Sequence, residues 1–169
     1  GSTAFAPKLD RVFTAKTDGS TSVFKLSDLS AVDRVSFGDN FDGVIYDAAT
    51  NLLAFQQADN SKELLVDAST MKLVGTIEVE GTQLERPALD SKRNIYIQMR
   101  DQHTVYKVSL KDKKISAKRD VSEQCTEPSG ADCDVANNPH VLACRGTHRA
   151  PGVAVVRHES GTCTSSRRI

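Results

Sequence analysis

Residues 60–100, NSKELLVDASTMKLVGTIEVEGTQLERPALDSKRNIYIQMR, decide the fold predicted for this chain. Short apolar runs alternate in them with clusters of Asp, Asn, Ser and Gly, which is typical of short strands joined by tight turns. The predicted strands are 63–66, 73–79, 87–89 and 95–99. Two turns separate neighbouring runs, at Asp67–Thr70 and at Asp90–Asn94. The stretch therefore predicts antiparallel β-sheet.

The turn at Asp67–Thr70 recurs along the chain. It has one counterpart forty-two residues earlier, at Lys25–Asp28, and another forty-two residues later, at Ser109–Asp112. A fourth copy, at Arg157–Ser160, follows after a longer gap. The turn at Asp90–Asn94 repeats as well, at 47–51 and at 134–138.

A four-stranded unit of roughly 40–45 residues is the period of a β-propeller blade. One such blade is too small to bury its own faces, so blades must stack to form a core. We therefore predict an all-β fold of four-stranded antiparallel blades, in a partial or open β-propeller of about four blades. The expected blade units are approximately 1–34, 35–77, 78–119 and 120–169, with the first and last blades incomplete.

Three groups of segments carry a resemblance to a known family. They are FDGVIYD at 41–47, VDAST at 66–70 with LVGTI at 73–77, and CTEPSG at 125–130 with ACR at 143–145. With these motifs the chain resembles the YVTN-repeat, YncE-like family of bacterial seven-bladed propellers, from Thr3 to Ile169. The resemblance implies about four blades of a seven-bladed ring.

The sequence departs from the family pattern in two ways. The Asp that opens the repeated turn is kept only at Asp67, and Lys25, Ser109 and Arg157 replace it elsewhere. Pro139 and His140 stand where the family usually carries apolar strand residues. Both departures suggest a looser final blade.

Stacked blades predict a core and open ends. The residues expected between the sheets are Val66, Leu73, Val74, Ile77, Ile95, Ile97, Val105 and Ile115. The chain has no initiator Met and stops at Ile169, where the resemblance continues into another strand, so a fragment or an open stack is favoured. If no blade closes the ring, partial exposure is expected at Phe5, Val12, Phe13, Val153, Val155 and Val156. Open blade edges of this kind favour self-association.

The formal net charge is zero, with 22 basic and 22 acidic residues. This balance disfavours a long-range electrostatic attraction to nucleic acid or to acidic membranes. No apolar run approaches the ~20 residues of a membrane span. A local basic cluster exists at Lys107, Lys111, Lys113, Lys114, Lys118 and Arg119. It is interpreted either as the solvated face of an outer hairpin or as a patch that contacts phosphates.

All four cysteines follow residue 124. The resemblance implies a disulfide between Cys125 and Cys144, and such a bond implies an oxidising compartment. Cys133 and Cys163 are left to pair or to remain reduced. A zinc site that includes His140 and His148 is the alternative, but no two cysteines have the close spacing usual for structural zinc.

Three predicted loops, 38–43, 80–87 and 122–130, lead to the same end of a propeller channel. They place six charged residues near one rim: Asp39, Asp42, Glu85, Arg86, Glu123 and Glu127. Of these, Asp42, Glu85, Arg86 and Glu127 are the candidate ligand-binding residues. Carboxylates that converge with an Arg could bind a cation or a polar ligand. The alternative is that they only bond loop amides and cap turns. No nucleophile elbow, zinc-protease helix motif or Gly-rich phosphate loop occurs, so we expect no catalytic residue, no metal site and no cofactor.

The leading functional hypothesis is a non-enzymatic propeller segment that presents loops to an unknown small molecule or protein, in the periplasm or outside the cell. Fold-level analogy carries this hypothesis. One alternative is a lactonase- or dehydrogenase-like propeller enzyme with a metal on the rim acids. The other, implied by the resemblance, is single-stranded DNA binding through the basic cluster.

Overall fold

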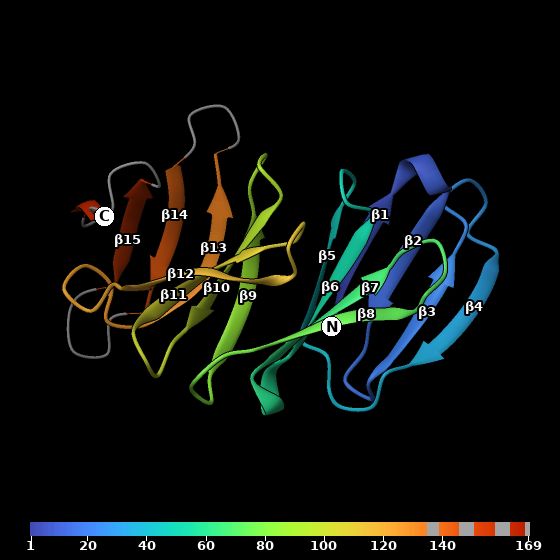
Figure 1. The fold of residues 1–169 in the computed structure, drawn as a ribbon, viewed down its shortest axis with the longest axis horizontal. Coiled ribbons are helices and arrows are strands. Elements are labelled where there is room, and N and C mark those ends of the chain that lie inside the picture. The colour runs from blue at the N-terminus through green and yellow to red at the C-terminus, as the bar shows by residue number, and fades with distance from the viewer. Residues whose placement is uncertain (135–138, 146–150, 158–162, 168–169) are drawn as a thin grey trace. The chain divides into compact units, whose positions relative to one another are not determined.

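The computed structural model describes residues 1–134, 139–145, 151–157 and 163–167, and this part of the chain is all-β (Figure 1). The strands form four four-stranded antiparallel sheets, in which each strand pairs with its neighbours along the chain. The prediction of four-stranded antiparallel blades is therefore confirmed. None of the helical segments in the described ranges has the length and apolar character needed to cross a membrane.

The first sheet contains β1 (Ser2–Ala6), β2 (Arg11–Ala15), β3 (Ser20–Phe24) and β4 (Ala31–Ser36). The second contains β5 (Gly43–Asp47), β6 (Leu52–Gln57), β7 (Lys62–Asp67) and β8 (Leu73–Glu78). The third contains β9 (Leu84–Leu89), β10 (Asn94–Met99), β11 (Thr104–Ser109) and β12 (Lys114–Asp120). The fourth contains β13 (Pro128–Cys133), β14 (Pro139–Cys144), β15 (Gly152–Arg157) and β16 (Cys163–Arg167). Short 3-10 turns, η1 (Pro7–Leu9) and η2 (Ala58–Asn60), follow β1 and β6.

The expectation of incomplete end blades is wrong. The first and fourth sheets each have four strands, like the two sheets between them. The blade predicted at about 1–34 is complete because the short segment STAFA, Ser2–Ala6, forms its first strand. The third strand expected in the opening stretch is also longer than 87–89, because β9 begins at Leu84.

The chain divides into two compact units, Gly1–Glu78 and Val79–Ile169. In the first unit, β1 of the first sheet contacts β5 of the second. Phe13 of β2 and Phe55 of β6 are both fully buried in the shared core. Phe41, in the loop before β5, stacks on Phe55 with a centroid distance of 4.9 Å. The two sheets therefore bury their facing sides against each other, as stacked blades do.

The second unit repeats this arrangement with the third and fourth sheets, where β9 contacts β13. Its core includes Tyr96 of β10, Val105 of β11, and Leu142 of β14, which is fully buried. The disulfide residues Cys125 and Cys144 also belong to this core.

The prediction of buried residues is only partly right. Val66, Ile77, Ile95, Ile97 and Val105 are buried as expected. Three others are exposed, at 51% for Leu73, 38% for Val74 and 38% for Ile115. All three lie at the start of the fourth strand of a sheet, which has a hydrogen-bonded neighbour on one side only. An apolar run on such an edge strand looks like core in the sequence although little packs on it.

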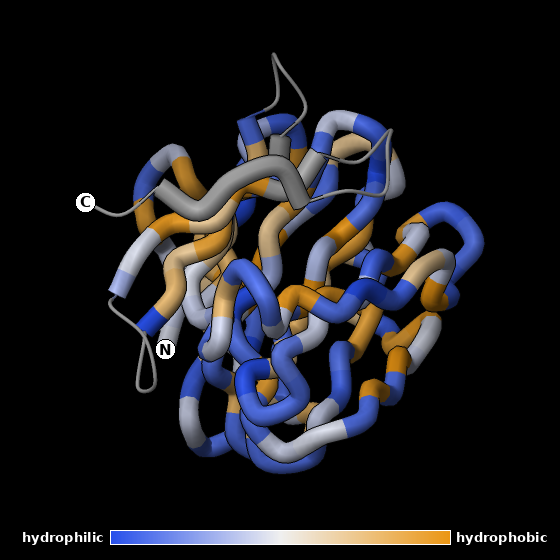
Figure 2. Tube along the Cα trace, turned by 90° about the vertical axis from the view of Figure 1, so that its left-hand side faces the viewer, coloured by the Kyte–Doolittle hydropathy of each residue, from blue (hydrophilic) through white to orange (hydrophobic). Residues whose placement is uncertain are grey.

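The end residues differ in their exposure. Phe5 is 56% exposed, whereas Val12 and Phe13 are buried. Val153 and Val155 are half-buried, and the side chain of Val156 lies outside the described residues. Figure 2 shows that hydrophobic and hydrophilic stretches alternate along the chain.

The repeated turns are held by their own side chains. Asp67 accepts hydrogen bonds from the backbone N–H groups of Ser69 and Thr70, and Asp90 accepts one from Asn94. Asp and Asn stabilise turns in this way. The turn copy predicted at Arg157–Ser160 and the 134–138 turn lie largely outside the described residues.

Gly19 closes the turn between β2 and β3 with a φ of 72°. A Cβ at this position would lie 1.6 Å from the carbonyl oxygen of Gly38. We expect Gly19→Ala to lower the free energy of unfolding by more than about 2 kcal/mol, because both the backbone conformation and the close approach exclude a side chain. Gly130→Ala is the matched control, since a Cβ there meets nothing within 4 Å, and its effect should stay within about 0.5 kcal/mol. Equal denaturation midpoints of the two variants would contradict this reading.

Glu63 of β7 is fully buried, and neither carboxyl oxygen has a hydrogen-bond partner among the described residues. Burial raises the pKa of Glu63 from 4.5 to about 8, because it penalises the charged form. The folded state thus keeps a proton that the unfolded chain releases. Stability is highest below pH 4.5 with respect to this group and falls as the pH rises toward 8.

Glu63→Gln should remove this pH dependence, because the amide does not ionise. Between pH 5 and 8 the free energy of unfolding of the wild type should fall relative to the variant by up to about 1.4 kcal/mol per pH unit. Urea denaturation across this range measures the difference. In the exposed control Glu78→Gln, the free energy of unfolding should depend on pH as it does in the wild type. The same pH dependence in Glu63→Gln would refute the prediction.

Candidate functional site

Charged side chains gather at one end of the second unit. Glu85 is the second residue of β9. Arg100 directly follows the end of β10, and Arg145 directly follows the end of β14. Because β9 and β10 pair in the third sheet, and β9 contacts the fourth sheet through β13, these strand ends meet. The strand ends of two adjacent sheets thus bring together residues that are up to sixty positions apart in the sequence.

Glu85 is the centre of this charged cluster. Its Oε1 accepts a hydrogen bond from Nη1 of Arg100 at 2.9 Å. Nη2 of Arg145 lies 3.7 Å from the same oxygen. The side chains of Glu85 and Arg100 are 20% and 22% exposed, whereas that of Arg145 is 57% exposed. One half-buried carboxylate therefore faces two guanidinium groups.

The loop before β9 is fixed to the turn after β10. Asp101 accepts hydrogen bonds from the backbone N–H and the hydroxyl of Thr82 and from the backbone N–H of Gln83. Burial raises the pKa of Asp101, but these hydrogen bonds outweigh it, so the pKa lies below its ordinary value. Asp101 is thus a carboxylate anion that is stabilised by hydrogen bonds from the loop before β9.

A similar tie holds the loop before β5 in the first unit. Asn40 donates to Asp59 at 3.1 Å, and Asn60 donates to Asp39. These bonds connect the loop to η2 after β6. Hydrogen bonds that hold the loops in place were one of the two interpretations of the polar loop residues.

The predicted ligand-binding residues are distributed over both units. Glu85 and Glu127 lie around Arg145, whose backbone N–H donates to the carbonyl of Glu127 at 3.1 Å. Arg86 follows Glu85 on β9 and is exposed. Asp42 lies in the first unit, before β5, and its backbone N–H donates to the carbonyl of Gln56. A site that includes all four remains a prediction.

Sequence reasoning missed Arg100 and Arg145. Arg100 is not among the candidate residues predicted from the sequence, and Arg145 enters there only as part of the family motif at 143–145. Each Arg directly follows the second strand of its sheet, at Met99 and at Cys144. This shared position in two successive repeats was the available signal.

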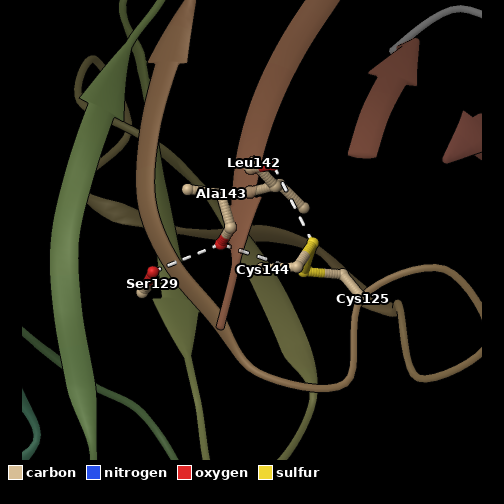
Figure 3. The surroundings of a disulfide bond; sticks show 5 residues. All are labelled: Cys125, Ser129, Leu142, Ala143 and Cys144. Carbon is tan, nitrogen blue, oxygen red and sulfur yellow. Dashed lines mark hydrogen bonds between the residues drawn. A yellow bond between two sulfur atoms is a disulfide. The ribbon is translucent and has the colours of Figure 1, made fainter. Parts of the chain in front are cut away.

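The disulfide between Cys125 and Cys144 is confirmed, with a Cα–Cα distance of 5.3 Å (Figure 3). It ties the loop before β13 to the last residue of β14. Next to it, the hydroxyl of Ser129 donates to the carbonyl of Ala143 at 3.3 Å. The bond therefore fixes the backbone from which Arg145 projects.

Cys133 is a free, buried cysteine at the end of β13. Burial, together with the nearby charges of Asp90 and Asp132, raises the pKa of its thiol to about 12, so the thiol is neutral at physiological pH. Cys163 and His148 lie outside the residues whose side chains are described. Within the described part of the chain, no three His, Cys, Asp or Glu side chains are grouped to hold a metal ion.

His140 is packed inside the second unit rather than at its edge. It lies on β14, the second strand of its sheet, and is fully buried. Its ring packs on Tyr96 with a centroid distance of 4.8 Å, and its Nε2 lies 3.2 Å from Nε2 of Gln98. His140 therefore joins the third and fourth sheets.

The basic cluster lies on β11, β12 and the turn between them, which we call the outer hairpin. Its lysines are mostly exposed, and Nζ of Lys118 pairs with Glu80 at 2.7 Å. Although the total charge is zero, the two units carry opposite net charges. The first unit has seven basic and eleven acidic residues, whereas the second has fifteen basic and eleven acidic residues. The outer hairpin, residues 104–120, contributes six basic and two acidic residues.

Comparison with known proteins supports the fold. No protein-family model matches the sequence, and no curated protein matches it. The structure is similar to that of hydrazine synthase from Kuenenia stuttgartiensis, with a TM-score of 0.87 and 12% sequence identity. The alignment covers 99% of this chain and 48% of that chain, so this chain spans about half of its length. At 12% sequence identity, the similarity shows a shared fold only. It supports the description of the four sheets as propeller-like blades.

The disulfide is expected to stabilise the second unit. It closes a loop with a sequence separation of 19, and loops of this size give about 3 kcal/mol in the chain-entropy model. The double variant Cys125→Ser/Cys144→Ser should therefore unfold at a lower urea concentration than the wild type. A dithiol reductant should bring the wild type close to the double variant and leave the double variant unchanged. Denaturation midpoints that do not respond to the double substitution would contradict this expectation.

Proposed function

We propose that this chain is a segment of a YVTN-repeat, YncE-like propeller protein and acts as a non-enzymatic binding module. Loops at the strand ends of its second unit present charged side chains to a small molecule or a protein. The observation that carries the proposal is the convergence of Glu85, Arg100 and Arg145 from three strand ends. Binding residues are disproportionately found on loops that a rigid scaffold positions.

The setting we propose is periplasmic or extracellular. The disulfide between Cys125 and Cys144 supports it, because such bonds persist in oxidising compartments. The repeated blade architecture supports the family, although the motifs that suggest it mark the fold more than the activity. The activity named for the hydrazine synthase belongs to that protein, since fold does not imply function.

Binding of a ligand is favoured over a metal-dependent enzyme at this rim. Glu85 is already paired with Arg100 at 2.9 Å. A second guanidinium, that of Arg145, lies 3.7 Å away. Two nearby positive charges oppose the approach of a metal cation to that carboxylate.

Nucleic-acid binding is the second candidate function. The observation that favours it is the concentration of positive charge on the outer hairpin, with six basic and two acidic residues in 104–120. Phosphate contacts of this kind give a strongly salt-dependent affinity. A single-stranded DNA affinity that falls steeply with salt and is lost in Lys111→Ala/Lys114→Ala would favour this candidate.

A thermal-shift screen with a defined panel of small polar compounds and short peptides tests the binding module. A ligand present at 100 times its dissociation constant stabilises a protein by about 2.7 kcal/mol, which corresponds to a rise in Tm of about 5 °C or more for a chain of this size. The rise should be reduced in Arg86→Ala/Glu127→Ala, which changes two of the predicted ligand-binding residues, one on β9 and one directly before β13. It should persist in Lys111→Ala/Asp112→Ala, a matched pair on the outer hairpin. A ligand whose Tm effect is reduced only in the Lys111→Ala/Asp112→Ala variant would contradict the proposed location of the binding site.

A further inference from the structure

We propose that Arg145, supported by Arg100, forms an oxyanion-binding site, so that the ligand of the proposed binding module carries a carboxylate or phosphate group. This inference rests on the proposed function and specifies the chemistry of its ligand. It follows from the unequal way in which Glu85 engages the two arginines.

Arg100 is held in place by two side-chain hydrogen bonds. Its Nε donates to Oε1 of Gln83 at 2.9 Å, and its Nη1 donates to Oε1 of Glu85 at 2.9 Å. Its backbone N–H also donates to the carbonyl of Gln83 at 2.9 Å. With 22% of its side chain exposed, Arg100 is a fixed, half-buried positive charge.

Arg145 is held much more loosely. Its Nη2 lies 3.7 Å from Oε1 of Glu85, which is longer than a hydrogen bond. The side chain is 57% exposed, so its guanidinium donors face solvent. Arg145 therefore retains the planar fork of N–H donors that matches carboxylate and phosphate oxygens.

The three charged groups around Glu85 carry a net positive charge, which favours binding of an anion. Glu85 supplies one negative charge to two guanidinium groups. Asp101, in the turn directly after Arg100, already accepts three hydrogen bonds from Thr82 and Gln83. An oxyanion on the solvent side of Arg145 would supply the missing partner, with Arg100 behind it as a second positive charge.

The backbone of Arg145, unlike its side chain, is held in place without a ligand. Its backbone N–H donates to the carbonyl of Glu127 at 3.1 Å. The preceding residue, Cys144, is bonded to Cys125. A preorganised backbone lowers the entropic cost of binding, which favours recognition by a single side chain.

The test is a nuclear magnetic resonance titration of the full chain with inorganic phosphate and, separately, with acetate, against sodium chloride at the same ionic strength. We expect a saturable shift of the Arg145 Nε–H resonance, with a dissociation constant in the millimolar range usual for a single small anion. The stronger of the two titrations identifies phosphate or carboxylate as the preferred group. Shifts no larger than those caused by chloride would overturn the inference.

Three variants sharpen the test. Arg145→Gln should weaken anion binding at least tenfold, followed at the Arg100 Nε–H resonance. Lys111→Gln removes the same charge from the outer hairpin and should change the affinity less than twofold. Glu85→Gln removes the competing carboxylate and should tighten binding several-fold, whereas a cation site would lose affinity. Equal affinities of Arg145→Gln and Lys111→Gln would overturn the inference.

The inference and the proposed function fail separately. A panel compound without any anionic group whose Tm effect is lost in Arg86→Ala/Glu127→Ala would support the binding module and overturn the oxyanion site. Saturable anion binding that depends on Arg145 would support the site even where the panel contains no strong ligand.

Discussion

The structure depends on the packing of one four-stranded sheet against the next. A single sheet of this size cannot bury either of its faces, so its apolar residues are stable only when a second sheet covers them. In the first unit, Phe13 of one sheet and Phe55 of the next share a core. In the second unit, Tyr96 and Leu142 do the same.

The packed faces are not purely apolar. Glu63 is buried without a hydrogen-bond partner for its carboxyl oxygens among the described residues, and burial of such a group favours its neutral form. Gln98 and His140 are buried too, but they contact each other across the two sheets of the second unit. Buried polar groups with partners restrict how two sheets can register, whereas one without partners only lowers stability.

The charged cluster shows how a repeat fold builds a site. The third and fourth sheets bring strand ends together at one end of the second unit, so two residues from one blade and one from the next assemble the group. Glu85 comes from the start of a first strand, and Arg100 and Arg145 come from the ends of two second strands. The disulfide at Cys125 and Cys144 holds the last of these ends in place. Such a site can change its ligand through a few side chains while the scaffold stays the same.

Most of the strands, the turns and the blade period could be predicted from the sequence, because these depend on local turn chemistry at residues such as Asp67 and Asp90. The resemblance it carries also indicated the disulfide. Burial was decided by the tertiary structure: Leu73 is an apolar strand residue like Val66, but it lies on an edge strand and is 51% exposed. The pairing of Arg145 with Glu85 was likewise decided by the tertiary structure, because it joins residues sixty positions apart through the packing of two sheets. Local pattern determines secondary structure, whereas burial and long-range contacts depend on which sheet faces meet.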